Sequence, residues 1–157
     1  MEDTILETED VLVRSLRPKD LEAVIRLDAK NVGRRREEYF KLKLAQNLAE
    51  TGIQVSLAAE KDGLFVGFLL SRVFYGEFGI PEPVAILDTF GVDPDFSGQG
   101  VGHALLEQLR TNLAGLGVGQ LRSEVSWDDV RLIRFFQREG FMPAPRICLE
   151  LPLGPGF

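Results

Sequence analysis

The sequence has few of the residues that form covalent cross-links or metal sites. Among 157 residues it contains one cysteine, Cys148, and one histidine, His103. A single cysteine permits neither an internal disulfide nor a cysteine-based zinc site. We therefore expect no bound metal, and this cysteine usage is consistent with a predicted cytoplasmic location.

Basic residues are in the minority, and long apolar runs are missing. Eighteen Lys and Arg face 24 Asp and Glu, which leaves a net charge of −6. This charge repels phosphate backbones and anionic lipid surfaces, so the sequence predicts no nucleic-acid partner. No stretch is long enough to span a bilayer, and the acidic residues 1–10 lack the features of a signal peptide. We expect no membrane association.

The remaining composition is that of an ordinary globular protein. Hydrophobic residues make up 45% of the chain and charged residues 27%, close to average usage. The length suits one domain with a substantial core. The chain shows no repeat and no linker, so we predict a single domain over residues 1–157, with a core over about residues 11–152 and frayed ends.

Apolar periodicity and turn residues predict a mixed α/β fold. Strands are expected at 11–16, 53–59, 64–73, 84–92, 118–125 and 146–151. Helices are expected from 21, over a second segment ending near 52, from 101, and at 128–139. The predicted order is therefore β-α-α-β-β-β-α-β-α-β.

A glycine-rich segment joins the strand that ends at Val92 to the helix that begins at Val101. It reads Ser97-Gly98-Gln99-Gly100-Val101-Gly102. A loop of this kind presents backbone N–H groups at the positive end of a helix dipole, which suits a phosphate or pyrophosphate. A plain surface turn is the alternative.

Two common nucleotide motifs do not fit this segment. A P-loop needs Lys and then Ser or Thr after its last glycine, but His103-Ala104 follow here. The dinucleotide fingerprint has the spacing G-x-G-x-x-G near the start of its domain, whereas this chain has G-x-G-x-G late in the sequence.

The segment instead resembles the coenzyme A loop of the GNAT (GCN5-related N-acetyltransferase) superfamily. The family pattern is a strand ending in Val-x-Pro, followed by Arg/Gln-x-x-Gly-x-Gly/Ala at a helix start. This chain has Val92-Asp93-Pro94 and then residues 97–102. Further on, the family has a strand, an Asn-led helix, and an aromatic residue four before a Gly-Phe pair, where this chain has Glu124-Val125, Phe136 and Gly140-Phe141. The resemblance covers nearly the whole chain.

The resemblance implies the GNAT fold and a binding mode for acetyl-coenzyme A. The fold is a mostly antiparallel twisted sheet with helices on both faces, in which the fourth and fifth strands splay apart. The pantetheine arm would bond main-chain groups in the splay, where Gly91 suits a bulge, and the pyrophosphate would lie on the N–H groups of residues 98–103. The implied coenzyme-binding residues are Phe90, Gly91, Val92, Ser97, Gly98, Gln99, Gly100, Val101, Gly102, His103, Asp129, Phe136 and Arg138.

Two carboxylates are candidates for the general base. Glu124 resembles the strand glutamate that ribosomal-protein N-terminal acetyltransferases carry twelve residues before their catalytic tyrosine. Asp88 is the alternative, because two-residue alternation predicts that it shares a strand face with Phe90 and Val92. Either carboxylate could accept a proton from an ammonium group. A solvated Glu124, or one paired with Arg122 or Arg131, is the competing interpretation.

The chain departs from the family pattern at three positions. The tyrosine that often protonates the leaving thiolate corresponds to Phe136, the helix-opening Asn to Asp129, and the Arg/Gln of the loop to Ser97. Arg138 is a candidate to supply positive charge instead. Because a thiol has a pKa near 8.5, a thiolate can leave without a dedicated acid at some cost in rate.

The resemblance implies an acyl-CoA-dependent N-acetyltransferase. It would move an acetyl group from acetyl-CoA to a primary amine of a small molecule or a peptide by direct attack. Because Phe136 replaces the family's tyrosine, a non-catalytic acyl-CoA sensor or partner-binding module is the alternative function. A structural domain without a ligand is the third possibility. Homodimerisation is expected from the family alone.

Four other features receive structural interpretations. Cys148 is expected to be a small core residue of the closing strand, Trp127 and Phe135 are expected to pack in the core or a cleft, and the ring of His103 is expected to be exposed. The run of three arginines at 34–36 is interpreted as a solvated helix start, with an anion contact as the alternative.

Overall fold

The computed structural model describes residues 10–49 and 55–155, and the chain divides into two compact units, residues 1–124 and 125–157. The first unit holds the sheet and three α-helices. The second holds α5 (Val130–Arg138) and the C-terminal segment. The single domain over 1–157 stays a prediction.

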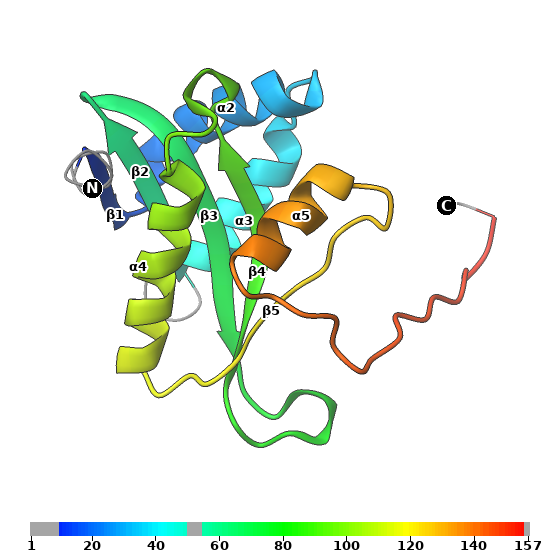
Figure 1. The fold of residues 1–157 in the computed structure, drawn as a ribbon. Helices are drawn as coiled ribbons and strands as arrows, with labels where there is room; N and C mark the ends of the chain where they lie inside the picture. The colour runs from blue at the N-terminus through cyan, green and yellow to red at the C-terminus, as the bar shows by residue number, and fades with distance from the viewer. Residues whose placement is uncertain (1–9, 50–54, 156–157) are drawn as a thin grey trace. The chain divides into compact units, whose positions relative to one another are not determined.

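The first unit is built on one five-stranded sheet. Its strands follow one another in chain order, and β1 to β4 pair antiparallel while β4 and β5 pair parallel (Figure 1). Asp62 and Gly63, with φ of 52° and 77°, form the tight turn between the second and third strands. The fold class is confirmed. The strands are β1 (Val11–Ser15), β2 (Leu57–Lys61), β3 (Leu64–Phe74), β4 (Val84–Val92) and β5 (Leu121–Ser123).

Helices cover both faces of this sheet (Figure 1). The pair α2 (Leu21–Val32) and α3 (Glu37–Ala49) covers one face, and α4 (Val101–Gly115) covers the other. Phe68 and Leu70 of β3 lie in the core under α2 and α3 with Phe40. Gly67, the residue before Phe68, faces α4 instead, because a Cβ placed there would lie 2.8 Å from Val101 Cγ1. The alternation of strand residues thus fills two cores.

A β-bulge interrupts β4 at Asp88. Leu70 pairs with Thr89 while the next residue, Ser71, pairs with Leu87, so Asp88 is the extra residue. The prediction of a bulge at Gly91 is wrong. Gly91 pairs regularly with Phe68, and it is needed because that ring lies against the strand: a Cβ at Gly91 would lie 2.7 Å from Phe68 Cε1.

Replacing Gly91 by alanine is therefore expected to destabilise the protein. The added methyl group has no room beside Phe68, and overpacking a tight core typically costs about 1–3 kcal/mol. Chemical denaturation of Gly91→Ala and wild type would measure the difference. Gly119→Ala is the control, because nothing lies within 4 Å of its added Cβ. Equal losses in both variants would contradict this explanation.

The second unit corrects three expectations. Residues 146–151 form no strand, although one was predicted there. Ile147 and Leu149 are 84% and 86% exposed, so the apolar alternation that suggested a strand has no partner in the described part of the chain. Cys148 is exposed and is not a core residue. Trp127 is 89% exposed rather than packed.

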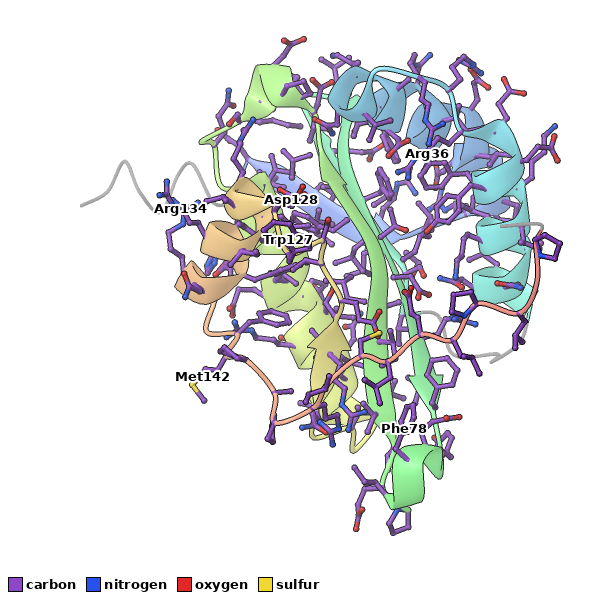
Figure 2. The ribbon with its side chains drawn as sticks, turned by 90° about the vertical axis from the view of Figure 1, so that its right-hand side faces the viewer. Arg36, Phe78, Trp127, Asp128, Arg134 and Met142 are labelled. Carbon is purple, nitrogen blue, oxygen red and sulfur yellow. The ribbon has the colours of Figure 1, made fainter. Side chains whose placement is uncertain are left out.

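Two further features concern the outside of the molecule. Phe78 lies in the connection between β3 and β4 (Figure 2) and is 85% exposed. None of the helices within residues 10–49 and 55–155 combines the length and apolar character needed to cross a membrane.

The strand predicted to start at 53 begins at Leu57, and residues 53 and 54 lie outside the described residues.

Candidate active site

The parallel pair β4 and β5 separates part-way along its length. Pairing runs from Ala85 opposite Leu121 to Leu87 opposite Ser123, and β4 then continues to Val92 without β5. The Ser123 hydroxyl donates to the Leu87 carbonyl at 3.0 Å and closes the paired part. Residues 88–92 therefore border β3 on one edge, and on the other edge they pair with no strand of the described residues, as the predicted splay requires.

The bulge determines which main-chain groups reach the open edge. In an antiparallel ladder, alternate residues direct N–H and C=O toward the partner strand and away from it. The Asp93 N–H donates to the Val66 carbonyl of β3 at 2.8 Å. Gly91 lies two residues before Asp93, so its main-chain groups also point toward β3. Phe90 and Val92 consequently direct their main-chain groups away from β3, and the Val92 carbonyl accepts there from the Asn31 side chain at 3.0 Å. The expectation that all three residues offer main-chain groups is corrected for Gly91.

The glycine loop leads directly from this edge into α4. Gly98 and Gly100 have φ of 76° and 80°, left-handed conformations that glycine adopts without strain. The first helical bond runs from the Ala104 N–H to the Gly100 carbonyl at 3.0 Å. The N–H groups of residues 101–103 precede that bond and point out of the helix end. The arrangement suits an anion such as a diphosphate, and the His103 side chain is exposed as expected.

Two lysines from distant parts of the sequence hold this region. Lys30 of α2 donates to both Asp93 oxygens at 2.8 Å and to Asp95 at 3.0 Å. These hydrogen bonds, first to Asp93 and then to Asp95, raise the pKa of the Lys30 ammonium. Lys61 at the end of β2 donates to Gln99 Oε1 at 2.8 Å. No sequence pattern indicated Lys61, which brings a positive charge to the loop from 38 residues away in the chain.

Both candidate bases lie at the point where the strands part. Asp88 follows Leu87 on β4 and Glu124 follows Ser123 on β5, directly after the last pair of the parallel ladder. Glu124 is exposed, and within the described residues it has no ion pair. Arg122, one of the two suggested partners, donates to Gln120 instead. The carboxylate of Glu124 is thus available to accept a proton.

Asp88 is held differently. Its Oδ2 accepts from Arg72 Nε at 2.9 Å, and its Oδ1 lies 3.8 Å from Lys43 Nζ of α3. The side chain therefore lies on the face covered by α2 and α3, and not on the face of Phe90 and Val92. The predicted alternation fails because a bulge turns two consecutive side chains to the same side.

A hollow of about 560 Å³ is lined by residues 34–39, where α2 connects to α3. Arg36, labelled beside these helices in Figure 2, donates to both oxygens of Asp28 at 2.6 and 2.8 Å. Those hydrogen bonds raise the pKa of the Arg36 guanidinium. Tyr39 links the hollow to β4, because its hydroxyl lies 2.6 Å from the Thr89 hydroxyl.

The remaining predicted residues lie in the second unit. Asp129 is the N-cap of α5 and accepts from the Leu132 N–H at 3.2 Å, which matches the helix-opening position of the family. Phe136 is buried, and its ring centroid lies 4.7 Å from that of Phe141. It offers no proton to a leaving group. Arg138 lies in the last turn of this helix.

Comparison with known proteins shows to which family this chain belongs. The model of the acetyltransferase (GNAT) family matches residues 21–141. The chain belongs to this family. The aminoglycoside N(6')-acetyltransferase type 1 of Stenotrophomonas maltophilia is 32% identical over 116 residues, which cover 72% of this chain and 76% of that relative. The [ribosomal protein bS18]-alanine N-acetyltransferase of Escherichia coli K12 is 32% identical over 100 residues, or 64% of this chain and 62% of that relative.

Solved structures agree with the GNAT fold. The aminoglycoside acetyltransferase AAC(6')-Iy, in complex with a bisubstrate analogue of coenzyme A, has a TM-score of 0.75 at 19% identity over 92% of this chain and 99% of that chain. Membership confirms the predicted enzyme class: this GNAT protein is an acyl-CoA-dependent N-acetyltransferase with acetyl-CoA as its co-substrate. The roles of the individual site residues stay predictions.

Proposed function

We propose that this GNAT protein acetylates a primary amine by direct attack in the splay between β4 and β5, with Glu124 as the general base. One observation supports this proposal above all. A glycine loop at a helix start, a strand edge without a paired strand and an exposed carboxylate occur together, all within residues 88–124. The diphosphate of acetyl-CoA would lie on the N–H groups of residues 98–103, and the pantetheine arm would bond Phe90 and Val92 like an added strand.

The residues suit the coenzyme in two respects. Nothing lies within 4 Å of a Cβ placed at Gly98 or Gly100, so the loop leaves room for a phosphate against its backbone. Lys61 adds the positive charge that Ser97 does not supply. We also propose coenzyme contacts for Asp129 and Arg138, on the basis of the family resemblance.

The proposed reaction balances without a covalent enzyme intermediate. Glu124 accepts a proton from the ammonium group of the acceptor, directly or through water. The amine nitrogen then attacks the thioester carbonyl carbon, a C–N bond forms, and the C–S bond breaks. The electron pair leaves on sulfur as a thiolate, which takes its proton from solvent because Phe136 has none to give. The products are an N-acetylated amine and coenzyme A.

The proposed class of acceptor is based on the relatives of this protein. The relatives carry the names of an aminoglycoside and a ribosomal-protein acetyltransferase, so we propose a small-molecule or peptide amine as acceptor. Among the described residues, no group of three or more potential metal ligands is present, and the proposed chemistry requires none. Homodimerisation and a cytoplasmic location stay predictions.

Coenzyme binding and turnover give the direct test. Coenzyme A at 100 times its Kd should stabilise the fold by about 2.7 kcal/mol through mass action, visible as a higher melting temperature. Acetyl-CoA with a panel of amines and peptides should release free thiol, detected colorimetrically. A thermal shift without thiol release would favour the non-catalytic acyl-CoA sensor. No shift and no calorimetric binding would rule out the proposed function.

A further inference from the structure

The bulge in β4 creates a polar cluster that the reaction described above does not use. The bulge turns Asp88 and Thr89 to the same face, and α3 contacts both through Lys43 and Tyr39, which lie one helical turn apart. Arg72 of β3 completes the group. We call these residues, Tyr39, Lys43, Arg72, Asp88 and Thr89, the bulge cluster.

The charges of the bulge cluster do not balance. Asp88 is its single carboxylate, and it faces two cations, Arg72 Nε at 2.9 Å and Lys43 Nζ at 3.8 Å. All three side chains are largely buried, with exposures of 12% for Asp88, 21% for Arg72 and 19% for Lys43. Partial burial of an excess positive charge is costly unless an anion accompanies it. The cluster therefore has the charge of an anion site.

The neighbouring ion pairs on this side of the sheet differ from it. Arg36 has Asp28 to itself, Arg35 lies between Glu22 and Glu37, and Lys30 lies between two aspartates. In each of those groups, carboxylates equal or outnumber cations. Among the described ion pairs of α2 and α3, two cations share one carboxylate only at Asp88.

The cations of the bulge cluster also have donors to spare. Lys43 Nζ is 3.8 Å from Asp88, beyond hydrogen-bonding distance, and it makes no hydrogen bond to the described part of the protein. Arg72 uses Nε for Asp88 and lies with its guanidinium carbon 4.9 Å from the centre of the Phe74 ring. Its terminal N–H groups have no acceptor within residues 10–49 and 55–155. These donors suit the two oxygens of a carboxylate.

The position of the cluster relates it to the acceptor. Asp88 directly follows the last residue paired with β5, and Phe90, whose main chain faces the open edge, lies two residues further on. If the proposed function is right, the thioester lies along that edge. An acceptor that attacks it from the face of α2 and α3 meets Lys43 and Arg72.

We infer that the acceptor is a primary amine that also carries a carboxylate, as an amino acid does, and that Lys43 and Arg72 bind this carboxylate. The inference rests on the proposed function and adds the class of substrate. It disfavours polycationic acceptors, whose extra ammonium groups would meet the excess positive charge of the bulge cluster.

Matched pairs of amines test the inference. Each pair consists of an amino acid and the amine that lacks its carboxylate, such as phenylalanine with 2-phenylethylamine and ornithine with 1,4-diaminobutane. The measurement is kcat/KM for thiol release from acetyl-CoA. Wild type is expected to prefer the carboxylate-bearing member by about tenfold or more, the range of a charge-assisted hydrogen-bonded pair.

Variants of α3 connect that preference to Lys43. Lys43→Met should abolish the preference for the carboxylate-bearing member of each pair, and Lys43→Arg should retain it. Lys41→Met is the matched control, because Lys41 is on the same helix but more than half exposed and faces Glu38 at 3.9 Å. If Lys43→Met lowers the melting temperature, Arg72→Lys gives a second test, since it keeps the charge but loses the planar donor pair.

The outcomes separate this inference from the proposed function. Equal rates within the pairs, a preference for the carboxylate-free member, or a preference unchanged in Lys43→Met would overturn the inference and leave the acetyltransferase intact. Phosphoethanolamine with ethanolamine forms a further pair, and a preference confined to it would overturn the assignment of a carboxylate. If none of the amines, with or without a carboxylate, causes thiol release from acetyl-CoA, the proposed function itself is overturned, and the inference with it.

Discussion

Replacing Glu124 by glutamine is expected to lower kcat/KM by about 100-fold or more at neutral pH, because a positioned general base typically contributes about 10²–10⁴-fold. Glutamine has nearly the same shape but cannot take the proton of the ammonium group. The variant should depend on acceptor molecules that solvent has already deprotonated, so its rate should rise steeply with pH. Thiol-release assays across a pH series, with a confirmed acceptor, would show both effects.

Two further variants make the Glu124 result specific. Glu82→Gln removes another exposed carboxylate, in the loop before β4, and should behave as wild type. Asp88→Asn removes the alternative base. If Asp88→Asn shows the large loss and the changed pH profile while Glu124→Gln shows neither, the roles of the two carboxylates are reversed. Unchanged rates in both variants would mean that neither carboxylate is the base.

The local patterns of the sequence predicted the parts of the site that lie close together in the chain. Val92, Pro94 and the glycines at 98, 100 and 102 specify a strand, a turn and a helix start that need only neighbouring residues. The buried stripe of α4 follows in the same way, because Val101, Leu105 and Leu109 recur at helical spacing. The strand, the turn and the helix start were predicted correctly, whereas the parting of β4 and β5 was implied by the family resemblance and their parallel pairing was not predicted.

The bulge shows where such reasoning ends. Alternation predicts side-chain faces only while the register is regular, and no residue between Leu87 and Phe90 signals that one is inserted. One extra residue moved Asp88 to the face of α2 and α3 and brought it to Lys43 and Arg72. Contacts of this kind join segments far apart in the sequence, so periodicity within one segment cannot predict them. Lys61 at the glycine loop and Tyr39 at Thr89 were missed for the same reason.

The C-terminal segment shows the opposite error. The alternation of Ile147, Leu149 and Leu151 has the period of a strand, but a strand also requires a partner for its main-chain groups. Within the described residues these side chains remain exposed and the segment forms no ladder. A periodic pattern therefore predicts the capacity for a strand, whereas pairing decides whether it forms.

A negative charge at Gly98 is expected to weaken coenzyme A binding by about 10–100-fold, since two like charges 4 Å apart repel by about 1 kcal/mol in bulk water and about 4 kcal/mol near a protein surface. Gly98 has φ of 76°, and a Cβ there meets nothing within 4 Å. Asp and Asn are the side chains that best tolerate this conformation. Gly98→Asp and Gly98→Asn therefore differ by one charge at nearly constant shape and backbone cost.

The comparison of these two variants isolates the electrostatic part of the loop. Calorimetry should give a Kd for Gly98→Asn within a few-fold of wild type and a much higher Kd for Gly98→Asp. Raising the salt concentration should narrow the gap, because screening shortens the reach of a surface charge. Equal affinities of the two variants, at any ionic strength, would place the diphosphate away from residues 98–103. In that case the backbone donors at the start of α4 would not be the site at which acetyl-CoA is held, and the position of the thioester in the splay would lose its support.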